Sequence, residues 1–287
     1  MLVASKANLT VGMTVYDDYD GVFFTVQSLR LHHSAQPFDL IVTDQNPGSG
    51  YGRLTKAFVE KIGGLYIPQF GAKGGPPQGR NAYFEAAKPG VILSVDCHVL
   101  FDHGSIAWMM NWFIGREDSK DLVHGPMVYD ELRNCSTHWE PGWQTNNFGS
   151  WGHDARGNNP KNPPFEIPFS GVGVMACNKH AWVGYNPDFI GFGGEEWYIH
   201  RKFRQNGGKI WCLPCLRWVH RFGEMPHSTY PREMWKCIYN HLLGSIELSD
   251  MEDVKVQLKH WHASYPAELR QALAELSERG HLTVRKP

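Results

Sequence analysis

Short apolar stretches alternate with helical patterns through the first hundred residues of the chain. Each stretch has the length and the β-branched content of a buried strand: 9–15 (LTVGMTV), 38–43 (FDLIVT), 65–70 and 91–95 (VILSV). Helical spacing is found between them, at 22–31, 54–62 and 81–87, with Gly- and Pro-rich loops at 46–53 and 71–79. Strands that alternate with helices predict an α/β fold, in which helical crossovers connect the strands of a mostly parallel sheet.

The second half of the chain has a less regular pattern. A short helix is predicted at 104–115 and a strand at 165–177, and between them 133–164 is rich in Asn, Gly, Pro, His and Trp. We expect a long functional loop there, because its tryptophans argue against disorder. A helix is expected to end at Gly207-Gly208, and a strand follows at 209–213. Amphipathic helices at 231–248 and 265–280 would pack on the domain or on another subunit.

Composition narrows the class of protein. The chain has 287 residues, enough to bury a sizeable core, and its 28 basic residues nearly balance its 29 acidic ones. This balance argues against binding dominated by non-specific phosphate contacts. The aromatic content of 13% suits stacking on sugars or bases, and equally suits a large aromatic core. The six cysteines form no disulfide framework, and no signal peptide or membrane span is recognisable, so we expect a cytoplasmic protein with reduced thiols.

Polar residues follow the predicted strands at their carboxyl ends, where α/β sheets bind ligands. Tyr16, Asp44 and Asp96 all fall at such ends and can share one crevice. Asp96-Cys97-His98 places a carboxylate and an imidazole on the same side of an extended segment, so both can reach one cation. Mixed carboxylate and imidazole ligation suits Mn²⁺. The alternative is a buried histidine that bonds a carbonyl.

Two acidic residues are predicted to begin the helix that ends at Gly207-Gly208. Glu195 and Glu196 come directly after Gly193-Gly194, at a helix N-terminus where negative charge and anionic ligands are favoured. Adjacent helical residues differ in direction by roughly 100°, so the two acids do not face the same atom. The alternative is that they only complement the helix dipole.

These motifs together resemble the second half of a GT-A glycosyltransferase. Gly193-Gly194-Glu195-Glu196, followed by Pro214-Cys215-Leu216-Arg217-Trp218-Val219-His220, is similar to the Gly-Gly-Glu-Asn helix and Pro-Cys-x-Arg-x-x-His segment of polypeptide N-acetylgalactosaminyltransferases. The run from Gly191 to Glu196 is similar to the Gly-Trp-Gly-Gly-Glu-Asp turn of β-1,4-galactosyltransferases. It also resembles uncharacterised phage and bacterial glycosyltransferases with a Gly-Phe-Gly-Gly-Glu-Glu run. The resemblance covers about residues 9–222, with the motifs in family order.

The resemblance implies a GT-A fold, with a Rossmann-like, mostly parallel sheet flanked by helices and a C-terminal helical extension. It implies a nucleotide-binding half at 1–102, an acceptor-binding and catalytic half at 103–230, and the extension at 231–287. A UDP-sugar would be the donor, with Mn²⁺ or Mg²⁺ held by Asp96, His98 and His220. The nucleotide contacts would come from Thr14, Tyr16, Asp44, Arg80 and Asp96, although strand-end caps or surface charges are the alternative for these residues.

The catalytic residues implied by the resemblance are Glu195 and Glu196. One would hold sugar hydroxyls while the other faces the acceptor. Retaining relatives have Asn at the position of Glu196, whereas inverting relatives have an Asp that acts as general base. A carboxylate can take the acceptor proton, which favours inversion. The Asp-x-His form and His220 resemble the retaining group instead. Candidates to line the acceptor site are Trp143, Trp151, His153 and Arg156, and a loop packed on its own aromatics is the alternative.

The leading hypothesis is a metal-dependent glycosyltransferase that transfers a hexose or N-acetylhexosamine to an acceptor hydroxyl. The acceptor would be a glycan, a protein or a hydroxymethylated pyrimidine of phage DNA. DNA would need a basic rim, for which the candidates are Lys161, Arg201, Lys202, Arg204 and Arg221. A nucleotidyltransferase is opposed by the acidic run 16–20, and a non-catalytic sugar-binding module would not need Asp96, His98 and His220 together.

Overall fold

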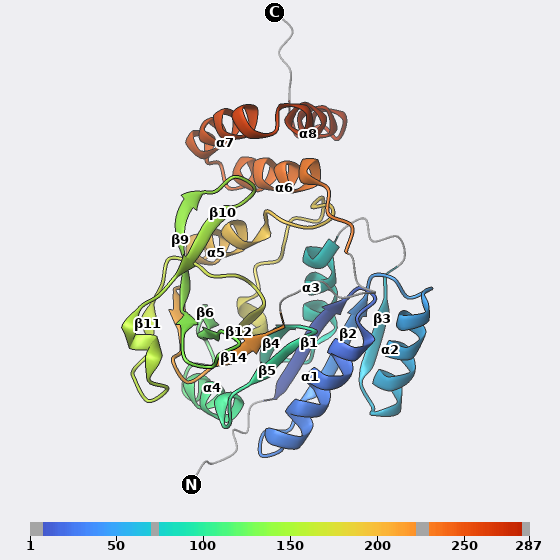
Figure 1. Cartoon of the computed structure of the whole chain (residues 1–287), viewed down its shortest axis with the longest axis vertical. Coiled ribbons are helices and arrows are strands. Elements are labelled where there is room, and N and C mark those ends of the chain that lie inside the picture. The colour runs from blue at the N-terminus through green and yellow to red at the C-terminus, as the bar shows by residue number, and fades with distance from the viewer. Residues whose placement is uncertain (1–7, 70–74, 222–229, 283–287) are drawn as a thin grey trace, which may run out of the picture.

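A computed structural model of the chain describes residues 8–69, 75–221 and 230–282. Its centre is an eight-stranded sheet with the strand order β11-β13-β6-β12-β4-β1-β2-β3, flanked by helices on both faces (Figure 1). This mixed α/β architecture confirms the predicted fold class.

The first half of the chain forms the parallel part of the sheet. Strands β1, β2, β3 and β4 pair in parallel, with bounds Leu9–Val15, Asp39–Asp44, Leu65–Pro68 and Val91–Asp96. Helices α1, α2 and α3 connect them, at Tyr19–His32, Gly50–Lys61 and Gly75–Ala86. The register sets Thr14 opposite both Asp96 and Thr43. The carboxyl ends of β1, β2 and β4 therefore meet at one edge.

Two of the predicted loops were too long, because helices begin inside them. Helix α2 begins at Gly50, where the Ser49 side chain caps it by accepting a bond from the Gly52 N–H. Helix α3 begins at Gly75 with two prolines in its first turn, where the missing N–H groups cost nothing. Glycine and proline are typical of loops, but at these positions they begin helices. Residues 71–74 and Phe70, the predicted end of the third strand, lie outside the described residues.

The second half of the chain adds mainly antiparallel strands. Strand β12 (Val174–Asn178) lies antiparallel between β4 and β6 (Leu122–His124). Beyond β6 the sheet continues with β13 (Ile210–Cys212) and then β11 (Phe165–Glu166). The prediction of one continuous strand at 165–177 was wrong. Pro168 cannot donate to a strand ladder, and Gly171 and Gly173 follow it, so the chain leaves the sheet between β11 and β12.

A second, smaller sheet brings residues 218–220 next to the segment that follows β4. Strand β14, Trp218–His220, pairs antiparallel with β5, Val99–Phe101, so that His220 lies opposite Val99. Its other neighbour is β7, Met127–Val128, which pairs with β8, Cys135–Ser136. The pairing of β14 with β5 sets His220 beside the segment that carries His98.

About half of the long segment predicted as a loop is a β-hairpin. Strands β9, His138–Trp143, and β10, Phe148–Gly152, pair with Trp139 opposite Trp151, and a short 3-10 helix follows at Ala155–Asn158. The two tryptophan rings lie 5.2 Å apart in an edge-to-face arrangement. Cross-strand aromatic pairs stabilise such strands although the segment contains Pro and Gly. Composition therefore misled the sequence interpretation here.

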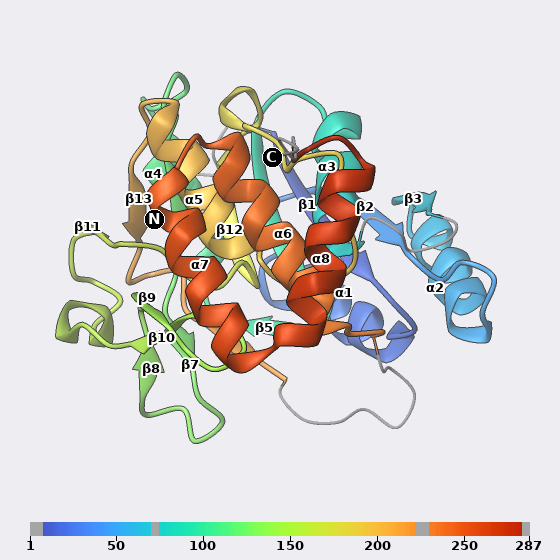
Figure 2. The same cartoon turned by 90° about the horizontal axis from the view of Figure 1, so that it is seen from above.

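The core lies on both faces of the large sheet, as the alternation of strand side chains requires. On β4, Leu93 packs with α1, α2 and α4 (Ser105–Phe113), whereas Ile92 packs with α3 and α5 (Glu195–Gln205). Three C-terminal helices pack against the core that contains Ile92 and form a cap at one end of the molecule (Figures 1 and 2). They are α6 at Met234–Glu247, α7 at Met251–Ser264 and α8 at Pro266–Glu278. They pack on the domain, and α7 was not predicted.

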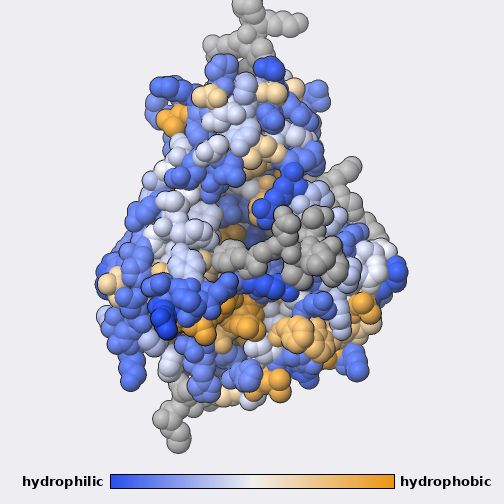
Figure 3. Space-filling view, viewed as in Figure 1, coloured by the Kyte–Doolittle hydropathy of each residue, from blue (hydrophilic) through white to orange (hydrophobic). Residues whose placement is uncertain are grey.

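The outer surface of this helical cap is mainly hydrophilic, whereas apolar side chains gather on the lower half of the same face of the molecule (Figure 3). Helices that bury one face against a core show this polarity. Within the described residues, none of the helices combines the length and the apolar character needed to cross a bilayer.

Candidate active site

Three side chains from distant segments converge at the carboxyl edge of the sheet. Asp96 ends β4, His98 follows it, and His220 ends β14. One ligand atom from each lies within 4.8 Å of the other two. The Nε2 atom of His220 is 3.5 Å from Oδ2 of Asp96, and the two imidazole rings are 4.8 Å apart, edge to face. The structure thus brings together the three residues expected to bind a metal.

The chemistry of this cluster fits a divalent cation. One carboxylate with two imidazoles is a donor set that Mn²⁺ accepts. Burial raises the pKa of Asp96, but the His220 hydrogen bond and the Arg80 charge outweigh burial and leave this pKa below its ordinary value. The carboxylate is therefore an anion. Space beside it depends on Gly173, since a Cβ atom there would lie 3.0 Å from the Asp96 Oδ2 atom.

A buried arginine connects the cluster to the acidic helix start. The Arg80 side chain, on α3, lies with Nη2 3.5 Å from Asp96 Oδ1 and with Nη1 3.5 Å from Glu195 Oε1. The residue is only 6% exposed. The sequence predicts that Arg80 contacts the nucleotide. In the structure it lies between the two carboxylates and holds them at a fixed separation, because a carboxylate that moved away would leave the buried guanidinium charge without that partner.

The two glutamates have different surroundings. Glu195 is 1% exposed, and its Oε2 atom has no hydrogen-bond partner among the described residues. Glu196 is half-buried. Burial, and then the charge of Glu195, raise the pKa of Glu196 to about 8. Burial also raises the pKa of Glu195. Glu195 thus has an acceptor atom left for a ligand hydroxyl, and Glu196 can exchange a proton near neutral pH.

The expected nucleotide contacts lie at the ends of β1 and β2. The Thr14 and Thr43 hydroxyls are 3.0 Å apart, and the half-buried Tyr16 ring packs edge to face on Tyr230 at 5.1 Å. Tyr230 also contacts the ring of Phe192 in the glycine-rich turn, at 5.7 Å. This tyrosine was missed by sequence reasoning, because no local pattern marks it.

Asp44 lies deeper than the other expected nucleotide residues. It is fully buried, the Tyr66 hydroxyl donates to its Oδ2 atom at 2.6 Å, and the Asn46 N–H donates to its Oδ1 atom at 2.8 Å. Burial raises the pKa of Asp44, which the Tyr66 and Asn46 bonds partly offset. Its contact with the nucleotide remains a prediction, and Tyr66 is a partner that the sequence did not indicate.

The four candidate acceptor residues contact different neighbours, and their role in acceptor binding remains a prediction. Trp143 stacks on His260 of α7 at 4.8 Å and meets His241 of α6 at 5.2 Å. Trp151 is 43% exposed on the hairpin. His153 is hydrogen-bonded to the Cys135 carbonyl, and Arg156 pairs with Asp154.

A tryptophan outside the predicted acceptor set lies directly beside the proposed base. Trp197 follows Glu196 on α5 and contacts Phe148 of the hairpin and Phe169, with centroid distances of 4.9 and 5.0 Å. It connects the hairpin to the acidic helix start and is a further candidate for acceptor contact.

Most of the basic residues proposed as a DNA-binding rim are engaged within the protein. Arg201 pairs with Asp250 at 2.5 Å, and Lys202 with Glu247 at 2.8 Å. The Arg204 guanidinium donates to the Ile167 and Pro168 carbonyls, and Arg221 pairs with Asp18. Lys161 is exposed. These contacts leave little of the rim available for phosphate.

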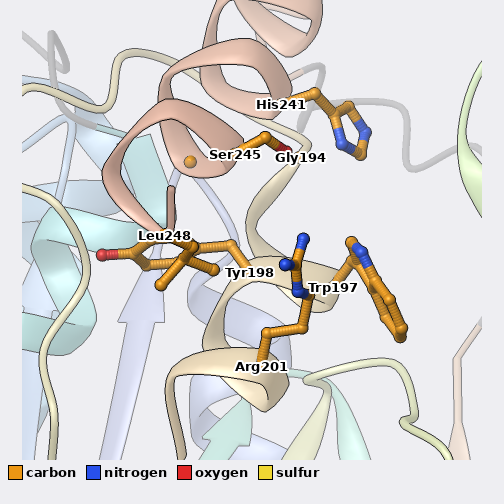
Figure 4. A pocket seen from close by; sticks show the side chains of 8 residues that line it. Gly194, Trp197, Tyr198, Arg201, His241, Ser245 and Leu248 are labelled. Atoms are coloured by element: carbon orange, nitrogen blue, oxygen red, sulfur yellow. The ribbon is translucent and has the colours of Figure 1, made fainter. Parts of the chain in front are cut away.

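A small cavity between α5 and α6 has about 10 Å³ of space, which suffices for roughly one water molecule (Figure 4). Among its lining residues are Trp197, Arg201 and His241, and Figure 4 shows the last two on facing helices. A sugar does not fit in such a volume.

Comparisons with known proteins show the fold. No protein-family model and no curated protein matches the chain. A structure of GalNAc-T7 with UDP, GalNAc and Mn²⁺ matches 83% of this chain with a TM-score of 0.62 at 15% identity. The chain spans only about half of that protein, 47%.

Two microbial structures show the same fold. TarS from S. aureus with UDP-GlcNAc matches 89% of this chain and 73% of its own, with a TM-score of 0.53 at 15% identity. The mannosyltransferase PcManGT from Pyrobaculum calidifontis with GDP-Man and Mn²⁺ matches 97% and 76%, with a TM-score of 0.55 at 12% identity. The chain therefore has the fold of GT-A glycosyltransferases.

Proposed function

We propose that the protein is a metal-dependent glycosyltransferase that moves a hexose or N-acetylhexosamine from a UDP-sugar to an acceptor hydroxyl. The observation that carries the proposal is the convergence of Asp96, His98 and His220 within 4.8 Å, next to the acidic start of α5. The fold supports it, because the three similar structures contain nucleotides or nucleotide sugars, and two of them contain Mn²⁺.

The residues of the cluster would hold Mn²⁺ or Mg²⁺, which when bound neutralises the diphosphate of the leaving nucleotide. Tyr16 and Thr14 would contact the nucleoside at the end of β1. Arg80 keeps Asp96 and Glu195 in place through its two ion pairs. The unpartnered Oε2 atom of Glu195 would accept a hydrogen bond from a hydroxyl of the donor sugar.

Glu196 would act as general base in an inverting transfer. Its half-buried carboxylate, with a pKa raised to about 8, can accept the proton of the acceptor hydroxyl as that oxygen attacks the anomeric carbon. The bond from the anomeric carbon to the diphosphate breaks in the same step. Retention is the competing outcome, and NMR of the anomeric proton in the product decides between the two.

For the acceptor, we favour a glycan or protein hydroxyl over hydroxymethylated DNA. Four of the five residues of the proposed basic rim bind carboxylates or carbonyls of the protein itself. Mass spectrometry after incubation of UDP-sugars with glycan, peptide and hydroxymethylated DNA acceptors tests this choice. A mass increase of one hexose on the DNA alone would contradict it.

Calorimetry with UDP tests the proposed function directly. Wild-type protein should bind UDP in the presence of MnCl₂ and lose that binding with EDTA, and Asp96→Ala should abolish it. Asp118→Ala is the matched control, because Asp118 is an exposed acid and should bind as wild type does. UDP binding that does not depend on metal would remove the metal assignment.

A further inference from the structure

A buried carboxylate lies directly behind the metal cluster. Asp18, in the turn between β1 and α1, is 4% exposed, and its Oδ2 atom is 2.8 Å from Nδ1 of His98. The same oxygen is 2.5 Å from Nη2 of Arg221, the residue after His220. Its other oxygen, Oδ1, accepts the Gly21 N–H at 3.0 Å and caps α1. One carboxylate thus contacts the segments that carry both imidazoles.

The charge of this carboxylate is secured by its partners. Oδ1 accepts from the Gly21 N–H and Oδ2 from the Arg221 guanidinium, two groups that can only donate. An Oδ2 atom that acts as acceptor needs a donor on the imidazole side as well, so the proton of the His98 ring in this contact lies on Nδ1. The Arg221 N–H also donates to the His98 carbonyl at 3.1 Å, which ties the backbones of the two segments together.

We propose that Asp18 is a positioning residue of the metal site, which fixes the orientation and tautomer of His98 so that Nε2 carries the lone pair offered to the cation. Arg221 balances the charge of Asp18 and sets β14, with His220, against the same carboxylate. This inference rests on the proposed function, because it assumes that His98 binds a metal. A carboxylate behind a metal-binding histidine has this effect in many proteins, and its loss weakens metal binding about 10–100-fold.

The test must separate this role from the capping of α1. Asp18→Ser serves the purpose, because serine is a good N-cap and can still accept the Gly21 N–H but is too short to hold His98 as well. Asp20→Ser is the matched control: Asp20 lies in the same first turn and is exposed. Two readouts are needed, both free of enzyme activity. One is Mn²⁺ affinity, from EPR of free Mn²⁺ during a MnCl₂ titration. The other is the tautomer of the His98 ring, from ¹⁵N NMR of the metal-free protein.

We expect wild-type protein and Asp20→Ser to show His98 protonated on Nδ1 and to bind Mn²⁺ equally. Asp18→Ser should lose that tautomer signature and bind Mn²⁺ about 10–100-fold more weakly. Should Asp18→Ser fail to fold, Asp18→Asn, which keeps the shape and the cap, is measured in the same way. Asparagine has one side-chain oxygen instead of two, so it cannot accept from the Gly21 N–H and from His98 with separate oxygens, as Asp18 does. This variant should therefore also bind Mn²⁺ more weakly.

An unchanged tautomer or an unchanged Mn²⁺ affinity in the folded Asp18 variant would overturn the inference. Asp96→Ala in the same titration separates this outcome from a failure of the proposed function. If Asp96→Ala still binds Mn²⁺ like wild type, the metal site itself is wrongly placed. If Asp96→Ala loses Mn²⁺ and Asp18→Ser keeps it, only the role of Asp18 is refuted.

Discussion

Two buried charged residues, Arg80 and Asp18, organise the side chains around them in the site. Arg80 lies between Asp96 and Glu195, and Asp18 lies between His98 and Arg221. A buried charge without a partner is costly, so each pair restrains its members to one geometry. The sequence predicted the acids and histidines of the site, but it did not predict which of them are neighbours.

The role of Glu196 can be tested by an isosteric change. Glu196→Gln should leave UDP affinity intact and lower turnover about 10²–10⁴-fold, since an amide cannot accept the acceptor proton. In wild type, turnover should rise as the pH increases through about 8, because the base is active only when deprotonated. End-point assays of product at several pH values around 8 measure both the turnover of the variant and the pH dependence of wild type. Glu278→Gln, at an exposed glutamate, should behave as wild type. Full turnover in Glu196→Gln would exclude the residue as base.

A buried histidine between the helices should make the protein sensitive to acid. His241 is 6% exposed, and burial, followed by the charge of His260, lowers its pKa to about 3. The folded state keeps it neutral, whereas the unfolded state binds a proton below about pH 6.5. The stability due to this difference is present above pH 6.5 and is lost as the pH falls towards 3. By linkage the loss is about 2 kcal/mol at pH 5.

Urea unfolding at pH 7 and pH 5 measures this loss. His241→Phe keeps a ring against Trp143 but cannot titrate, so its stability should fall by about 2 kcal/mol less than that of wild type over this range. His103→Gln, at an exposed histidine, provides the comparison and should retain the wild-type dependence. Equal dependence in all three proteins would show that His241 is not buried neutral.

At the scale of elements, α5 determines where the two acids lie. Glycines at its two ends have left-handed backbone, with φ of 86° at Gly194 and 84° at Gly207. Sequence spacing predicted both ends, because such residues have a local signature. The two ends differ in surroundings: a Cβ at Gly194 would come within 2.9 Å of the His241 backbone nitrogen, whereas none of the described atoms lies within 4 Å of one at Gly207.

These two glycines make a matched pair for measurement. Gly207→Ala should cost about 1 kcal/mol, the price of left-handed backbone for alanine alone. Gly194→Ala meets backbone atoms of α6 as well, so we expect about 3 kcal/mol and a large loss of turnover, as the helix start must move. Thermal unfolding and product assays on both variants check this. Similar values at the two sites would mean that α6 does not constrain the helix start.

At the scale of the whole molecule, the C-terminal helices form part of the support for the candidate active site. Asn240 of α6 is fully buried; its Oδ1 atom accepts the Ile190 N–H at 2.9 Å. Its Nδ2 atom donates to the Ile190 and Gly193 carbonyls at 2.9 and 2.8 Å. One amide therefore holds both ends of the turn that precedes Glu195 and Glu196.

Removal of this amide should affect both stability and function. Asn240→Ala leaves three buried backbone groups without partners, at a cost of about 3 kcal/mol or more, since each such group costs ~1–3 kcal/mol. Turnover should fall as well, because the turn is no longer held. Urea unfolding and product assays test this, with Asn111→Ala on the exposed side of α4 as control. Normal turnover in a folded Asn240→Ala protein would show that α6 is only a structural addition.

Local patterns in the sequence determined the strand and helix alternation of the first half, the ends of α5 and the residue types of the site. These features depend on neighbours within a few positions, through side-chain periodicity and backbone preference. Only the tertiary structure decided that β14 pairs with β5 and thereby brings His220 to Asp96 and His98. It also decided that the Trp-rich segment contains a hairpin and that Asn240 holds the turn before Glu195. Such contacts join segments far apart in the chain, and their stability comes from pairing and burial that no local pattern records.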